Sequence, residues 1–148
     1  MADTDFALEE FLPYVLNQAA EASSLAFEKV YKAKYGMLRT EWRVLFHLGL
    51  YGQLTASDIC TRARMHKTKI SRAVHRLSQQ RMVTRTRDAD DRRVEHLTLT
   101  KKGIAAYTDL RSIAQRYDAQ LAGGLTAQEV EVLKRALAKL AQDAAPPA

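Results

Sequence analysis

The cationic, hydroxyl, imidazole and amide side chains between residues 66 and 80 could form hydrogen bonds with a polyanion. If this segment is a helix, Ile70, Ala73, Val74 and Leu77 fall on one side of it. The other side carries the residues Lys67, Thr68, Lys69, Ser71, Arg72, His75, Arg76 and Gln79. No Asp or Glu lies between Lys67 and Gln80. Because arginine pairs with guanine, and Ser, Thr and His can bond base edges or phosphates, the pattern predicts a helix that binds the major groove of DNA.

A second group that could bind DNA lies in the charged segment DADDRR, residues 88 to 93. An exposed hairpin tip is a poor place for Arg92 and Arg93 unless they have a partner. We expect Arg93 to enter a minor groove, where the negative potential is strong, and Asp91 to hold its guanidinium when DNA is absent. The alternative is an ordinary solvated charged turn.

The net charge of +6 is concentrated around these two groups. Residues 55 to 103 hold 13 Lys or Arg against 5 Asp or Glu, whereas the rest of the chain is slightly acidic. Such a basic region is typical of a nucleic-acid interface. A solvated basic surface would give the same charge, so charge alone leaves both readings open.

Hydrophobic periodicity and capping residues predict the elements that would position these side chains. Helices are expected over about 5–34, 40–51, 55–62, 66–80, 100–122 and 126–142, and strands over about 82–87 and 93–99. Pro13 either starts the first helix or kinks it. The expected N-terminal caps are Thr40, Thr55 with Asp58, Thr100, and Thr126 with Glu129.

This order predicts a mainly α fold with a small two- or three-stranded β-wing, a winged helix-turn-helix. Val130, Leu133, Leu137 and Leu140 recur at three- and four-residue spacing, which is the pattern of a helix that packs on another helix. The flanking helices have too little core of their own to cover such stripes, so we expect a homodimer. No linker is visible, so residues 1–148 are expected to form a single domain.

Other classes of protein lack their signatures in this chain. The composition is globular, no apolar run approaches the roughly 18 residues of a membrane span, and the acidic start argues for a cytoplasmic protein without a signal peptide. No zinc spacing, Gly-rich phosphate loop or nucleophile–base pair is present, and the four histidines are scattered, so we expect no metal, cofactor or enzymatic activity. Cys60 is expected to act as a small hydrophobe, although Arg62 and Arg64 nearby leave a redox role open.

The segments TEWRVLFHLGLYGQLTASDIC, HKTKISRAVHRLSQQRMV and DDRRVEHLTLTKKG resemble the MarR family of bacterial transcriptional regulators. The family's wing signature corresponds to the residues Asp91, Arg93, Leu97, Leu99, Thr100 and Gly103. The resemblance implies a DNA-binding lobe over about 38–103 and dimerisation helices over about 5–36 and 104–145. It also implies two recognition helices about 34 Å apart on a near-palindromic double-stranded operator.

The resemblance further implies a repressor. Many members of the family release DNA when a small phenolic or other aromatic acid, or its thioester, binds to them. In the family the second helix lines the effector pocket, where Trp42, Arg43, Phe46 and His47 could receive an aromatic carboxylate. The alternative is core packing for Trp42 and Phe46 and surface exposure for Arg43. A winged-helix module that binds protein, and a constitutive DNA binder without an effector, are the rival functions.

The chain departs from the family at two kinds of position. Arg64 and Arg81 stand where glycine is common, and we expect neither to require a positive φ, so that they add phosphate contacts at little cost. The peroxide-sensing members have a reactive cysteine in the first helix, and residues 5–34 contain none.

Overall fold

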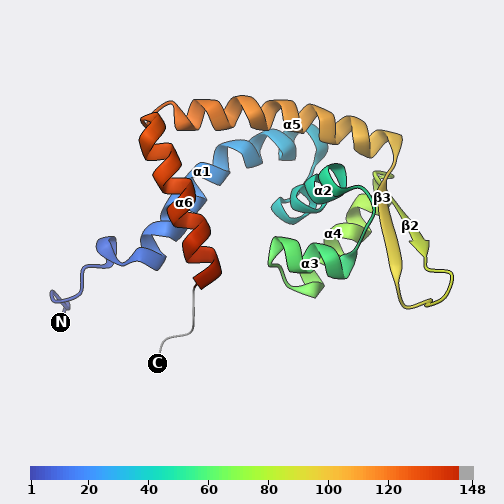
Figure 1. Cartoon of the computed structure of the whole chain (residues 1–148), viewed down its shortest axis with the longest axis horizontal. Helices are drawn as coiled ribbons and strands as arrows, with labels where there is room; N and C mark the ends of the chain where they lie inside the picture. The colour runs from blue at the N-terminus through green and yellow to red at the C-terminus, as the bar shows by residue number, and fades with distance from the viewer. Residues whose placement is uncertain (144–148) are drawn as a thin grey trace. The chain divides into compact units, whose positions relative to one another are not determined.

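The computed structural model describes residues 1–143 and contains six α-helices, one 3₁₀ turn and three short strands (Figure 1). In chain order these elements are η1 (Leu8–Glu10), α1 (Leu12–Tyr35), α2 (Arg39–Tyr51), β1 (Leu54–Thr55), α3 (Ala56–Ala63), α4 (Lys67–Gln79), β2 (Val83–Arg87), β3 (Glu95–Leu99), α5 (Lys101–Ala122) and α6 (Ala127–Asp143). The predicted mainly α fold with a small β-wing is confirmed. Contacts divide the chain into two compact units, Met1–Ile113 and a C-terminal unit that begins at Ala114.

The three strands form an antiparallel sheet in the order β1-β3-β2. β2 and β3 are the hairpin that the alternating pattern predicts, with Val83 opposite Leu99. The sequence left open whether a third strand is present, because β1 is only two residues long. Its Leu54 pairs with Leu97 and is buried, which joins the hairpin to the start of α3.

The core of the first unit lies where α2, α3 and α4 pack on one another and on the sheet (Figure 1). Its fully buried side chains include Leu45 of α2, Ile59 of α3, Ile70 and Leu77 of α4, and Leu97 of β3. Burying one such side chain contributes about 1.5–3 kcal/mol. The apolar face of α4 is therefore held by the core, and its opposite face is left to solvent.

Proline and a threonine cap determine where the long helices begin. Pro13 lies in the first turn of α1, where a missing N–H costs nothing, so it starts the helix and does not kink it. The Thr100 hydroxyl accepts a hydrogen bond from the Gly103 N–H (3.1 Å) at the start of α5, as predicted. A Cβ on Gly103 would lie 2.1 Å from the Met82 carbonyl oxygen, so this close approach requires glycine.

The predicted cap of α2 at Thr40 is wrong. The N-cap is Leu38, and Thr40 lies inside the first turn. Leucine has no side-chain acceptor, and the Glu41 carboxylate instead accepts a hydrogen bond from the Leu38 N–H. The other two expected capping boxes are present: Thr55 and Asp58 exchange hydrogen bonds of 2.9 and 3.1 Å, as do Thr126 and Glu129.

The expectation for Arg64 and Arg81 is also wrong. Both residues have left-handed backbone conformations, with φ of 53° and 60°. Each follows the end of a helix, α3 or α4, and turns the chain back over its last residues: Met65 N donates to Cys60 O (3.2 Å), and Met82 N to Leu77 O (2.9 Å). These are the positions at which glycine is favoured, because a Cβ crowds the backbone there. Two arginines therefore occupy strained positions at both ends of the recognition segment.

Candidate nucleic-acid interface

Helix α4 has the two faces that its sequence predicts. Ile70, Ala73, Val74 and Leu77 are buried, whereas every predicted DNA-contacting residue of the helix is exposed. Those exposed residues are Lys67, Thr68, Lys69, Ser71, Arg72, His75 and Arg76. The outward face thus presents cations and hydrogen-bonding groups on a helix that is anchored from behind.

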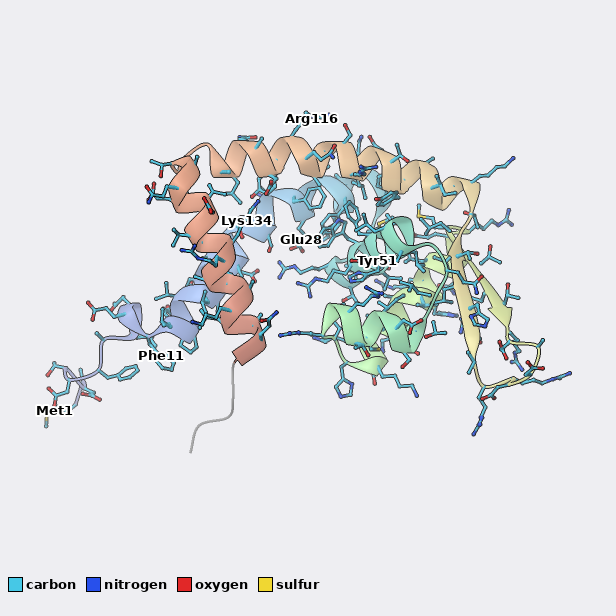
Figure 2. All side chains as sticks on the ribbon, in the orientation of Figure 1. Met1, Phe11, Glu28, Tyr51, Arg116 and Lys134 are labelled. Carbon is cyan, nitrogen blue, oxygen red and sulfur yellow. The ribbon has the colours of Figure 1, made fainter. Side chains whose placement is uncertain are left out.

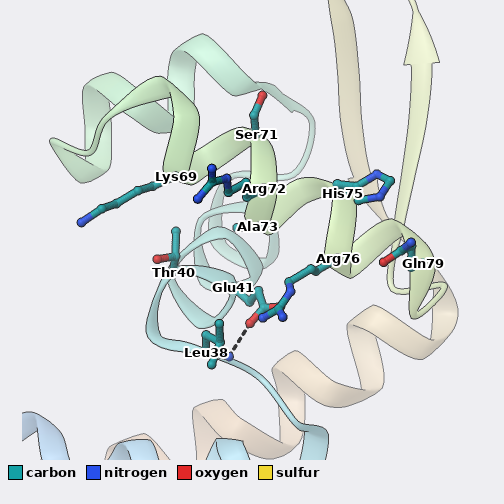
Figure 3. A pocket seen from close by; sticks show the side chains of 10 residues that line it. All are labelled: Leu38, Thr40, Glu41, Lys69, Ser71, Arg72, Ala73, His75, Arg76 and Gln79. Carbon is teal, nitrogen blue, oxygen red and sulfur yellow. Dashed lines mark hydrogen bonds and ion pairs between the residues drawn. The ribbon is translucent and has the colours of Figure 1, made fainter.

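A groove of about 660 Å³ runs between this face of α4 and the start of α2. Figure 3 shows Lys69, Arg72 and Arg76 extending from α4 on the side of α2 that carries Thr40 and Leu38. Ser71, His75 and Gln79 complete the α4 side of the lining. The groove brings three cations close together along one edge of the helix.

Arg76 and Glu41 form an ion pair across this groove, with 3.7 Å between Nη1 and Oε1 (Figure 3). The Glu41 side chain is only 2% exposed, whereas that of Arg76 is 53% exposed. A buried carboxylate is costly unless it is paired and hydrogen-bonded, and Arg76 and the Leu38 N–H supply both partners. Glu41 thereby orients Arg76, a role that the sequence reasoning missed. An acid at the third position of a helix was the available signal.

The tip of the β2–β3 hairpin holds its second arginine as predicted. Arg93 donates to Asp91 from its backbone N–H (3.0 Å), from Nε (3.1 Å) and from Nη2 (3.3 Å). The Arg93 side chain, followed by its backbone N–H, lowers the pKa of the Asp91 carboxyl. Arg93 is nevertheless 90% exposed, and Arg92 is exposed too. Figure 2 shows the side chains at this tip extending away from the rest of the lobe.

Trp42 and Phe46 belong to an aromatic cluster. The Trp42 ring stacks on Tyr31, with centroids 5.8 Å apart and planes 7° apart, and contacts Phe27 edge-on at 5.3 Å. The Phe46 ring centroid lies 5.1 Å from that of Trp42 and 5.2 Å from that of Tyr107. Trp42 Nε1 is buried without a hydrogen-bond acceptor within residues 1–143.

Arg43 and His47, the two polar members of the predicted ligand group, bond to nearby atoms of the chain. Arg43 Nη1 donates to Met65 Sδ (3.5 Å), and His47 Nδ1 donates to the Arg43 carbonyl (2.6 Å). The structure therefore gathers Trp42 and Phe46 in one aromatic cluster, while Arg43 and His47 are engaged with the Met65 sulfur and a backbone carbonyl. This arrangement fits the packing alternative for the two rings.

Other sequence expectations concern metals, membranes and Cys60. Within residues 1–143 no group of three or more His, Cys, Asp or Glu side chains could hold a metal ion. No helix in that range is long and apolar enough to cross a membrane. Cys60 is half-buried, and Arg62 lies over the Tyr51 ring, 4.1 Å from its centroid.

Comparison with known proteins identifies the family. The model of the MarR family matches residues 35–94. The chain is also 30% identical over 111 residues to the HTH-type transcriptional repressor MdtR of Bacillus subtilis. This aligned region covers 75% of this chain and 72% of MdtR. The chain belongs to the MarR family.

Two solved structures of similar fold are complexes, one with DNA and one with a small molecule. One is a complex of S. aureus MepR with DNA, with a TM-score of 0.80, 21% identity, and coverage of 89% of this chain and 97% of MepR. The other is NadR in complex with 4-hydroxyphenylacetate, with a TM-score of 0.74, 25% identity, and coverage of 97% and 99%. The matched region of the MarR family includes α2, α4 and the wing up to Val94.

Proposed function

We propose that this MarR-family regulator is a homodimeric repressor that binds a near-palindromic double-stranded operator in the bacterial cytoplasm. The observation that carries the proposal is the outward face of α4, which is cationic, free of acids and anchored by a fully apolar inner face. Acidic side chains there would repel phosphate. MdtR, the relative at 30% identity, is itself named a transcriptional repressor.

The contacts are divided between the helix and the wing. Residues of α4 enter the major groove and bond its bases and phosphates, and these residues are Lys67, Thr68, Lys69, Ser71, Arg72, His75 and Arg76. Arg92 and Arg93 of the wing contact the minor groove or the backbone, with Asp91 holding Arg93 in place. A protein-binding winged helix would present an apolar outward face instead, and α4 does not.

Dimerisation is supported by apolar side chains that each unit leaves exposed. In the first unit these include Phe11, Leu12 and Val15, at the start of α1 (Phe11 is labelled in Figure 2). In the second unit Val132, Leu133, Leu137 and Leu140 of α6 are each more than 40% exposed. Large apolar groups in such numbers are typical of a surface that a partner chain covers. Residues about 5–36 and 104–145 are therefore proposed to form the dimer interface, and residues 144 and 145 of that range lie outside the described part of the chain.

A small aromatic acid or its thioester is proposed as the effector that releases the repressor from DNA. NadR, at 25% identity, has been crystallised with 4-hydroxyphenylacetate. In this chain the aromatic cluster and the buried Nε1 of Trp42 would contact a ring and its acceptor group. Arg43 and His47 would then have to leave their present partners. A constitutive DNA binder is the second candidate, because those two side chains are already hydrogen-bonded.

A salt series of binding to DNA tests the function. A fluorescent duplex from the region upstream of the protein's own gene and a scrambled duplex of equal length are titrated in parallel. We expect tight binding to the first duplex, weak binding to the second, and a steep loss of affinity as salt rises. Aromatic acids and thioesters added to the complex then separate an effector-controlled repressor from a constitutive binder. Equal, weak binding to all genomic fragments in a pull-down would contradict the proposal.

A further inference from the structure

The wing contains a second charged group that the DNA contacts do not use, centred on Asp88. Its Oδ2 accepts hydrogen bonds from the backbone N–H groups of Asp90 (3.1 Å) and Asp91 (2.9 Å). Its Oδ1 accepts from His96 Nε2 at 2.8 Å. The Asp88 N–H itself donates to the Val94 carbonyl (2.9 Å), which closes the loop. One carboxylate thus joins both sides of the hairpin tip.

This carboxylate is connected to Arg93 through one intermediate residue. Asp88 fixes the backbone of Asp91, and the Asp91 carboxylate accepts three hydrogen bonds from Arg93. A hairpin tip has few other contacts that could fix an exposed guanidinium. The direction of Arg93 therefore depends on whether Asp88 keeps its place, and the His96 imidazole holds the Asp88 carboxylate from the strand side.

We propose that Asp88 and His96 are positioning residues of the wing, and that protonation of His96 strengthens the arrangement that presents Arg93 to DNA. This inference rests on the proposed role of the wing in DNA binding. Neither residue contacts DNA in the proposal; both act through Asp91 and Arg93.

The groups around His96 come from the wing loop, from α3 and from the sheet. Asp88 faces it from the wing loop, and Asp58 at the start of α3 is the other carboxyl near it. Its neighbours across the sheet, Thr86 on β2 and Thr55 on β1, carry no charge. On its own strand Glu95 is engaged with Arg85, with 2.7 Å between Oε2 and Nε.

The pKa values of the Asp88 and Asp58 carboxyls are lowered. The His96 hydrogen bond, followed by the N–H groups of Asp91 and Asp90, lowers the pKa of Asp88 to about 2. The pKa of Asp58 is lowered chiefly by the Thr55 N–H and hydroxyl, with a smaller part from Arg62 and His96. Asp88 is therefore ionised throughout the range in which histidine side chains titrate.

The sign of the pH dependence follows from this pairing. Below the histidine range the imidazolium donates a charge-assisted hydrogen bond to Asp88, and above it the neutral ring keeps at most an ordinary one. A contribution of this kind is fully present at low pH and is lost as the pH rises through the range in which histidine side chains titrate. Because the pair is partly exposed, we expect an effect on DNA affinity of about two- to fivefold.

The test measures operator affinity at about pH 6 and about pH 8 for the parent, His96→Gln and Asp88→Asn. Asparagine can still accept the two loop N–H groups, so Asp88→Asn preserves the turn while it removes the charge. Glu95→Gln is the matched control, since it removes a carboxylate from the same strand and leaves Asp88 and His96 untouched. His66 and His75 are present in every variant, so their own titration cancels in the comparison.

The parent is expected to lose about two- to fivefold more affinity than His96→Gln or Asp88→Asn over this interval, with Glu95→Gln behaving like the parent. Amide NMR of the DNA-free protein gives an independent readout: the Asp90 and Asp91 signals should move with the titration of His96 and stay still in His96→Gln. Equal pH slopes in parent and variants, or immobile Asp91 signals in the parent, overturn the inference. Because the NMR arm uses no DNA, it separates failure of this inference from failure of the proposed function.

Discussion

At the residue scale, the wing and α4 each hold an exposed arginine in place through a neighbouring carboxylate. Arg93 is almost fully exposed, yet two hydrogen bonds from its guanidinium and one from its backbone N–H to Asp91 restrict the side chain before any DNA arrives. Arg76 is restricted by buried Glu41. Ordering these side chains in advance lowers the conformational entropy that binding would otherwise cost.

Arg93→Ala should weaken operator binding by about 1–3 kcal/mol and leave the thermal unfolding midpoint unchanged, because the side chain buries almost no surface. Fluorescence anisotropy and a thermal melt measure the two quantities. Lys32→Ala, which removes an exposed cation of α1, controls for the change in net charge. A folded Arg93→Ala dimer that binds as tightly as the parent would refute the wing assignment.

Arg72→Ala and Lys69→Ala should weaken DNA binding in different ways, the first at one base position and the second at all sequences. If Arg72 pairs with a guanine, its loss costs about 1–3 kcal/mol at one base position and relaxes discrimination there. If Lys69 contacts a phosphate, its loss weakens all sequences alike and reduces the slope of log affinity against log salt by about 1. Binding to a panel of single-base operator variants at several salt concentrations distinguishes them. Unchanged discrimination in Arg72→Ala would argue against direct readout.

At the element scale, the turns on either side of α4 combine strain with charge. Arg64 and Arg81 adopt the left-handed conformation that glycine adopts without cost. Arg64 begins the turn between α3 and α4, and Arg81 lies in the turn between α4 and β2. Keeping arginine there places two cations beside the recognition face. The strain is held by hydrogen bonds such as that from the Thr100 hydroxyl to the Arg81 carbonyl, at 2.7 Å.

Arg81→Gly should raise the free energy of unfolding by about 0.5–1 kcal/mol, because it removes the crowded Cβ. Arg81→Ala is the matched control, since it loses the same cation but keeps the Cβ, and its stability should not rise. Urea unfolding measures both. Equal stability of the two variants would show that the left-handed backbone carries no strain. If Arg81 also contacts phosphate, both variants should lose the same amount of operator affinity.

At the scale of the whole molecule, function requires a second chain. The leucines of α6 are exposed in the described part of the chain, residues 1–143, and a stable dimer buries on the order of 1,200–2,000 Å² of surface in total. Two copies of α4 reading two half-sites would also double the number of phosphate contacts.

Leu137→Glu should shift the protein from dimer to monomer and reduce both operator affinity and its dependence on salt, because one lobe alone makes half the phosphate contacts. Sedimentation velocity measures the first effect and a salt series the second. Lys134→Glu changes charge on the same helix without removing an apolar side chain, so it should remain dimeric. A dimeric Leu137→Glu protein with normal affinity would place the dimer interface elsewhere.

Local patterns were enough to predict much of this protein. The apolar face of α4, the presence of the β2–β3 hairpin, the helix start at Thr100 and the Asp91–Arg93 contact all follow from patterns over neighbouring residues. Periodicity, capping and turn chemistry act over a few residues, so they can be read directly from the chain. The family resemblance adds the order of these elements and a function to test.

Only the tertiary structure decided the features that need distant residues or the sign of a backbone angle. Glu41 meets Arg76 because α2 packs on α4, and His96 meets Asp88 because β3 pairs with β2. The third strand forms because Leu54 pairs with Leu97 on β3, although a segment of two residues is too short to predict a strand from the sequence. Arg64 and Arg81 have a positive φ because the chain must reverse direction between α3 and α4 and between α4 and β2, a demand that overrides the preference of arginine itself. Such long-range constraints determine where the charged side chains lie, whereas the sequence identified only which residues were candidates.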